Sequence, residues 1–288
     1  MKKLDPVRTL LGAGVCALLY WVILNLIISP IGFFLGRMAA ITLSTLFAAL
    51  ISGGLAIAIF ESRSLLDIGL NWHRGASRNL LIGMALGIGG AILVILFPLA
   101  TGMAHFEALD KVAKADVSWR AGVFLPFLLF CGAAGEEIAF RGFALQYLMR
   151  GYGNWAAICG MGALFGALHA LNPGASTLGV VNTAGFGILF GLALVRTHDL
   201  WLPIGIHFGW NATLPWLGVE LSGLTIRVTR YQLVWTTGNL WSGGAYGPEA
   251  SPLASAILVI LFVLVWRIPV RRGSTFLLDA ESDPELLA

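Results

Sequence analysis

Residues 131–145 read CGAAGEEIAFRGFAL and place two adjacent glutamates and an arginine inside an otherwise apolar segment. One acid at the centre of a membrane helix costs about 2.5–3.5 kcal/mol on insertion scales, so two adjacent acids need partners. Because residues i and i+4 share a helix face, Glu137 can pair with Arg141. Glu136 lies about 100° further around the helix and can face another group. A buried Glu–Arg pair that fixes helix packing therefore leaves Glu136 unexplained.

The composition of the chain is that of a membrane protein. Of its 288 residues, 58% are hydrophobic and only 11% are charged, and the mean hydropathy is +0.84. Soluble domains are about 25% charged. The net charge of +3 is small and scattered, so we expect no nucleic-acid partner. Cys16, Cys131 and Cys159 all lie in apolar runs, which argues against a disulfide framework.

The apolar runs predict an all-α, polytopic membrane fold of about eight transmembrane helices. A helix that crosses the hydrocarbon core needs about 20 mostly apolar residues. The predicted spans lie near Leu10–Ile28, Ile31–Phe60, Leu80–Met103, Val123–Met149, Trp155–Leu171, Leu178–Val195, Leu200–Leu217 and Pro252–Trp266. The fourth is long, and we expect Gly132 or Gly135 to break or bend it. Two glycine-rich stretches, GMALGIGGA and GFGILFG, predict close helix contacts.

The placement of basic residues predicts the orientation. With eight spans, one side of the membrane holds Lys2, Lys3, Arg8, Arg63, Arg74, Arg78, Arg150, Arg196, Arg267, Arg271 and Arg272. The other side holds Lys111, Lys114, Arg120, Arg227 and Arg230. The positive-inside rule makes the first side cytoplasmic. We therefore expect an integral protein of a bacterial or archaeal cytoplasmic membrane, with both termini in the cytoplasm.

The chain divides into four predicted regions. Residues 1–120 hold the first membrane helices and no motif, and residues 121–217 hold the polar residues considered below as a catalytic core. Residues 218–251 form an extracytoplasmic loop, and residues 252–288 form the last span and a short acidic tail. Between spans, His105–Arg120 predicts an interfacial helix. The stretch TIRVTRYQLVW (225–235) alternates like a strand or lies on the membrane surface.

Three further polar residues lie in predicted spans. His169 occurs in MGALFGALHALNPG, and His207 and Asn211 are four residues apart in IGIHFGWNATLPW. Each alone can be explained by a hydrogen bond to a neighbouring helix. Packing does not require a carboxylate, two histidines and an amide on three separate spans. Ionisable residues inside a membrane indicate a functional site.

These residue types suit hydrolysis by an activated water. The sequence has no H-E-x-x-H, no G-x-S-x-G and no aspartate at the centre of a span, which excludes three common protease sites. A buried carboxylate can act as general base near neutral pH, with a histidine orienting the water. A second histidine and an amide can donate to a developing oxyanion. No nucleophilic side chain is needed.

Three motifs resemble one known family. EEIAFRG matches E-E-x-x-x-R, FGALH matches F-x-x-x-H and HFGWN matches H-x-x-x-N. In this order they are similar to the CAAX protease and bacteriocin-processing family of intramembrane endopeptidases. The resemblance covers about Phe124–Trp216, a third of the chain, and implies eight helices around a conical cavity open to the cytosol. It also implies hydrolysis of a peptide bond in a membrane-associated or lipidated substrate.

The resemblance further implies a role for each motif residue. Glu136 would activate the water, with His169 assisting, and His207 and Asn211 would form the oxyanion site. Glu137 and Arg141 would be supporting residues. Two other functions remain open. One is a catalytically idle scaffold or bacteriocin-immunity protein of the same family. The other is an ion- or proton-coupled transporter, against which no pair of similar halves is visible.

A zinc site is the alternative to metal-free catalysis. Glu136, His169 and His207 would supply two nitrogens and an oxygen. Asn211 is better suited to donate a hydrogen bond than to bind zinc, so we expect no cofactor. One geometric conflict remains, because His169 falls near the outer end of its span while His207 lies about 10 Å from the inner end of its own. The two can meet only if a helix starts deeper, tilts or is broken.

Overall fold

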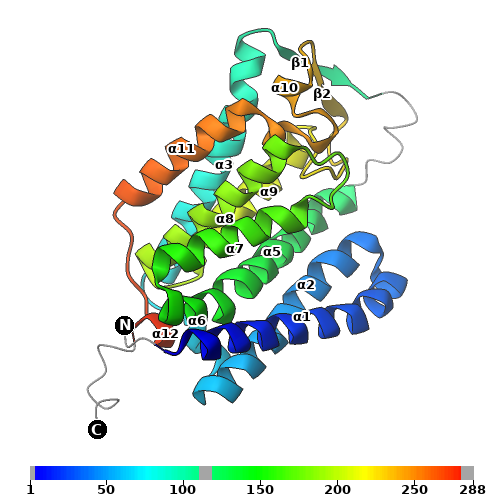
Figure 1. The fold of residues 1–288 in the computed structure, drawn as a ribbon. Helices are drawn as coiled ribbons and strands as arrows, with labels where there is room; N and C mark the ends of the chain where they lie inside the picture. Colours follow the sequence, from blue (N-terminus) through cyan, green and yellow to red (C-terminus); the bar gives the residue numbers. More distant parts are fainter. Residues whose placement is uncertain (1–3, 110–118, 280–288) are drawn as a thin grey trace.

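The computed structural model of this protein describes residues 4–109 and 119–279, and almost all of the long elements are helices (Figure 1). The principal helices are α1 (Pro6–Leu35), α2 (Arg37–Glu61), α3 (Ala76–Ala100), α5 (Trp119–Arg141), α6 (Phe143–Tyr152), α7 (Asn154–His169), α8 (Thr177–Thr197), α9 (Trp201–Trp216) and α11 (Pro252–Arg267). Each predicted span overlaps one of these helices or, for Ile31–Phe60 and Val123–Met149, two. The predicted all-α polytopic membrane fold is confirmed.

The helices differ in whether they can cross a membrane alone. By length and composition, five described helical segments can do so, namely Pro6–Leu35, Arg37–Glu61, Ala76–Ala100, Gly122–Tyr152 and Thr177–Thr197. Helices α7, α9 and α11 have 16 residues each, fewer than the roughly 20 that a full crossing needs. Most of α9 is buried among other helices, so its length need not match the bilayer.

The fourth predicted span is broken, but not at the predicted glycines. The helix is interrupted at Gly142, between α5 and α6. A side chain on Gly142 would overlap the carbonyl oxygen of Ile138 and the side chain of Ile68. Gly135 instead permits close packing, because a Cβ atom there would lie 2.6 Å from the backbone nitrogen of Leu46 in α2. The break leaves Glu136 and Glu137 in the last two turns of α5, which is the middle of the Gly122–Tyr152 segment, as expected.

Glycines hold the site-bearing helix α9 against α3, as the glycine-rich stretch predicted. Gly83 and Gly87 of α3 face Gly205 and Gly209 of α9, and a Cβ atom on any of them would overlap the backbone of the opposite helix. Gly205 and Gly209 flank His207 in the sequence. Small residues allow such close approach where lipid provides no hydrophobic drive for helix association. The two backbones therefore fix the position of His207.

The end of the bundle opposite the described termini carries a small sheet (Figure 1). Strand β1 (Ala104–Ala108) pairs antiparallel with β2 (Tyr231–Trp235). The strand interpretation of the 225–235 stretch is thus confirmed over β2. The interfacial helix predicted for His105–Arg120 is wrong over β1, because each residue of β1 is extended and pairs with a residue of β2. Residues 110–118 of that prediction lie outside the described part of the chain.

Both described ends of the chain lie at the other end of the bundle. The backbone nitrogen of Leu4 donates to the carbonyl of Arg150, and α12 (Phe276–Asp279) packs on α6. This arrangement agrees with both termini lying on one side of the membrane (Figure 1). The assignment of that side to the cytoplasm stays a prediction.

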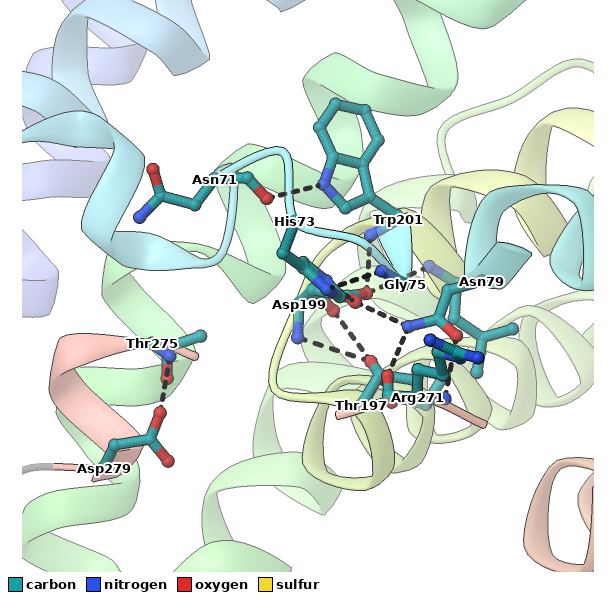
Figure 2. A network of polar contacts seen from close by, with 12 residues as sticks. Asn71, His73, Gly75, Asn79, Thr197, Asp199, Trp201, Arg271, Thr275 and Asp279 are labelled. Atoms are coloured by element: carbon teal, nitrogen blue, oxygen red, sulfur yellow. Dashed lines mark hydrogen bonds and ion pairs between the residues drawn. The ribbon is translucent and has the colours of Figure 1, made fainter. Parts of the chain in front are cut away.

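A buried carboxylate, Asp199, joins four segments at this end (Figure 2). Its Oδ2 atom lies 2.8 Å from Nε2 of His73 and accepts from the amide of Asn79 at 2.6 Å. Its Oδ1 atom accepts from the backbone nitrogen of Trp201 at 3.0 Å, in the first turn of α9. Asn79 also bonds both backbone groups of Arg271. Asp199 thus binds a backbone amide in the first turn of the helix that carries His207.

Candidate active site

The predicted site residues meet in one large cavity between the helices. Its volume is about 940 Å³, and its walls come from α1, α2, α5, α6, α7, α8 and α9, from the loop between α7 and α8, and from two segments beyond α9. Glu136, His169, His207 and Asn211 all line it. Most of the other lining side chains are apolar, so the polar groups form a small set in a hydrophobic surrounding.

The second glutamate of the pair is fully buried and binds two partners. Oε1 of Glu137 lies 3.1 Å from Nη1 of Arg141, as the i, i+4 spacing predicted. The same oxygen lies 2.8 Å from Nδ1 of His207, a contact that the sequence did not reveal. Arg141 also donates to the carbonyl oxygen of Gly187 in α8 at 3.1 Å. The buried ion pair therefore joins α5 to both α8 and α9.

Aromatic rings enclose this ion pair. The guanidinium carbon of Arg141 lies 4.5 Å from the ring centroid of Phe165 and 5.1 Å from that of Phe190. Phe190 also stacks on His207 at 5.0 Å between centroids. Cations are attracted to aromatic faces, and the rings exclude water from the pair. The ring of His207 is therefore fixed by a hydrogen bond on one edge and a stacked ring on one face.

The first glutamate faces the cavity. The side chain of Glu136 is 33% exposed, whereas that of Glu137 is 0% exposed. Oε2 of Glu136 lies 3.9 Å from Nε2 of His207. That oxygen is buried and has no hydrogen-bond partner among the described residues. Glu136 is thus the member of the pair that substrate can reach.

His169 reaches the cavity from the last residue of α7. Its Nδ1 atom lies 2.8 Å from the carbonyl oxygen of Phe165, one turn earlier, so Nδ1 donates and Nε2 is left for other partners. The ring of Phe165 contacts both histidines, at 4.5 Å from His169 and 6.2 Å from His207 between centroids. Helical side chains lean toward the N-terminus, which brings His169 toward the depth of His207. Asn211 lies one turn beyond His207 on α9.

The described residues do not form a ready-made metal site. No group of three or more His, Cys, Asp or Glu side chains within 4–109 and 119–279 is placed to hold a metal ion. The alternative set Glu136, His169 and His207 lines one cavity, but the Phe165 ring lies against both histidines. Catalysis without metal stays a prediction.

Glu249 is a cavity residue that the sequence did not indicate. It lies in the short helix η3 (Pro248–Ala250), within the predicted extracytoplasmic loop, and it lines the same cavity. Its Oε1 atom accepts from Nε1 of Trp210 at 3.0 Å, and its Oε2 atom accepts from the backbone and hydroxyl of Ser222. Burial raises the pKa of the Glu249 carboxyl, which outweighs the opposing effect of these hydrogen bonds. In the sequence Glu249 looks like any acidic residue of a loop. It differs only in its contacts with Trp210 and Ser222, which are distant in the sequence.

Comparison with known proteins agrees with the motifs. Residues 118–213 match the family model described as type II CAAX prenyl endopeptidase Rce1-like. No curated protein matches the chain. The matched residues include the two glutamates of α5, His169 of α7, and His207 and Asn211 of α9. By this match and by its three motifs, the part of the chain over residues 118–213 is similar to the CAAX protease family.

Proposed function

We propose that this protein is an intramembrane endopeptidase that hydrolyses a peptide bond of a membrane-associated or lipidated substrate. The observation that carries the proposal is the relay Arg141–Glu137–His207, which ends 3.9 Å from the cavity-facing carboxylate of Glu136. A buried pair that only fixed helix packing would not need a second acid facing a cavity. The similarity of residues 118–213 to the CAAX prenyl endopeptidase family supports the reaction class.

In the proposed mechanism, Glu136 is the general base. Its carboxylate takes a proton from a water in the cavity, and the resulting hydroxide attacks the carbonyl carbon of the scissile bond. His169 presents Nε2 to the cavity because Nδ1 is held by the Phe165 carbonyl, and so it can orient that water. The proton taken up by Glu136 then passes to the leaving amine.

His207 and Asn211 stabilise the oxyanion in this proposal. Glu137 accepts a hydrogen bond from Nδ1 of His207. When both ring nitrogens carry a proton, Nε2 of His207 donates its proton into the cavity. The Asn211 amide supplies a second donor one turn away. Donors that are fixed before the reaction stabilise developing charge without reorganisation, and removing one such donor costs about 10²–10³-fold in kcat.

The cavity supports a substrate with a large apolar part. Its apolar walls include Leu10, Ala17 and Leu24 of α1 and Leu164 and Leu168 of α7. A soluble peptide would gain little from such walls. A lipidated or membrane-embedded peptide would bury apolar surface at about 25 cal/mol per Å².

The function is tested with purified wild-type protein in liposomes. A panel of membrane peptides, with and without a lipidated cysteine, is incubated in water enriched in ¹⁸O, and the products are identified by mass spectrometry. We expect cleavage of at least one peptide, with one ¹⁸O atom in the new carboxylate. If folded protein cleaves no peptide of either class, the result contradicts an endopeptidase and favours the idle scaffold.

A further inference from the structure

A tight turn forms part of the wall of the cavity. Leu221 and Leu224 pair through reciprocal backbone hydrogen bonds of 3.0 and 2.8 Å, with Ser222 and Gly223 between them. Ser222 has φ +48° and Gly223 has φ +83°, the left-handed conformation of a two-residue hairpin turn. This conformation is unfavourable for serine, so other contacts must maintain it.

Three contacts hold this turn. Ser222 donates from its backbone nitrogen and its hydroxyl to Oε2 of Glu249, the latter at 2.9 Å. Its carbonyl accepts from the Asn172 amide at 3.1 Å. Gly223 donates to the carbonyl of Tyr246 at 2.8 Å. The Asn172 contact ties the turn to the loop that follows His169 by three residues.

The other carboxylate oxygen of Glu249 binds helix α9, which carries His207 and Asn211. Oε1 accepts from Nε1 of Trp210, which immediately precedes Asn211 in α9. The backbone of Glu249 is itself fixed, because its carbonyl accepts from the buried amide of Asn182 at 2.8 Å. One buried carboxylate thus connects the wall beside His169 to the helix of His207 and Asn211.

We propose that Glu249 is a positioning residue for peptide cleavage, which closes the 221–224 turn over the cavity and fixes Trp210 beside Asn211. The expected effect of Glu249 on cleavage rests on the proposed function. Its expected effect on the 221–224 turn does not. A carboxylate offers acceptors on both oxygens. Glutamine offers one acceptor and presents an amide to whichever donor it faces, so Glu249→Gln breaks one side of the bridge.

The structural consequence is tested by cysteine labelling, which does not depend on activity. Leu221 is buried and lines the cavity, so Leu221→Cys reports whether the turn is closed. The exposed native thiol is removed by Cys159→Ser and the cavity-lining one by Cys16→Ala, while Cys131 is buried and does not line the cavity. In folded protein, Glu249→Gln should raise the rate of maleimide labelling at position 221 by at least about fivefold. Glu107→Gln, an exposed acid on β1, is the control with the same charge change and should have no effect.

The catalytic consequence is tested on any peptide that the wild type cleaves. Glu249→Gln should lower kcat by at least about tenfold, the effect of one lost charge-assisted hydrogen bond, with a smaller change in KM. Ser222→Ala keeps the backbone donor and should show a smaller loss. The double variant should be no slower than Glu249→Gln alone, because both act through one contact.

The results separate the two proposals. Faster labelling with no cleavage by the wild type would support the positioning of the turn and contradict the endopeptidase. Unchanged labelling and unchanged kcat in Glu249→Gln would overturn the role of Glu249 and leave the endopeptidase intact. If Glu249→Gln does not fold, Ser222→Ala decides, and labelling at the wild-type rate then overturns the proposal.

Discussion

Nδ1 of His207 lies 2.8 Å from Oε1 of Glu137, so the buried second glutamate of the EE pair orients the histidine, while Glu136 faces the cavity. Two adjacent residues of the same type thus have different surroundings. Their positions on the helix explain this difference, because successive residues point about 100° apart. One glutamate meets the protein interior and the other meets the cavity.

This division of roles predicts different outcomes for the same substitution. Glu137→Gln leaves Arg141 buried without its counter-charge, so we expect a loss of about 3–5 kcal/mol of stability, together with loss of activity. Glu136→Gln removes a side chain that is 33% exposed, and its unfolding temperature should stay near that of the wild type. Thermal unfolding in one detergent measures both. Equal unfolding temperatures for Glu137→Gln and wild type would contradict the assignment.

Helix α3 provides a matched pair of glycines for testing how α9 is positioned. An alanine at Gly87 would overlap the backbone of Ile206, so Gly87→Ala should cost about 1–3 kcal/mol and shift His207, reducing kcat. A Cβ atom at Gly89 has nothing within 4 Å. Gly89→Ala should therefore be neutral or stabilising by up to about 1 kcal/mol. Similar unfolding temperatures and rates for the two variants would argue against the α3–α9 contact.

The docking of α12 should depend on pH. Burial raises the pKa of Asp279, but the hydrogen bond and charge of His198, the backbone hydrogen bond of Thr275 and the charge of Arg272 together lower it more, so the net pKa lies below the ordinary value of 3.8. A carboxylate with a lowered folded-state pKa stabilises the fold above its unfolded pKa and loses that effect as the pH falls through the folded value. Asp279→Asn should thus be less stable than wild type at neutral pH. The difference in unfolding temperature should close in acid, and a difference independent of pH would rule out this account.

Activity should survive removal of metal. The prediction rests on the carboxylate base and the two oxyanion donors, which need no ion to act. Purified active protein is analysed for zinc and assayed after chelation. Retained cleavage without stoichiometric zinc is expected. Zinc whose removal stops cleavage and whose return restores it would replace the metal-free mechanism, with the same residues as ligands.

Much of the fold was accessible from the sequence because membrane helices need long apolar runs. The break at Gly142 was not, since Gly132, Gly135 and Gly142 look alike in a single sequence. What distinguishes them is the neighbour that each meets. Gly135 packs on the α2 backbone, whereas Gly142 approaches Ile68 and the carbonyl of Ile138. Such contacts are set by helices far away in the chain.

For the candidate site, the sequence predicted which residues take part but not the contacts between residues far apart in the chain. Motif spacing indicated Glu136, His169, His207 and Asn211, and the i, i+4 rule gave the Glu137–Arg141 pair. The bond from Glu137 to His207 joins residues 70 apart, and that from Trp210 to Glu249 joins residues 39 apart. Neither pair has a short-range spacing in the sequence that would predict its contact. Glu249 in particular reads as an ordinary loop acid until the fold buries it.

The measurement that tests the central claim most directly is the cleavage rate of Glu136→Gln beside the wild type, on one peptide and in one lipid. The substitution keeps the shape of the side chain and removes only its ability to accept a proton. We predict a fall in kcat of about 10²–10⁴-fold, the usual contribution of a general base, with an unchanged unfolding temperature. A folded Glu136→Gln protein that cleaves at the wild-type rate would contradict the account.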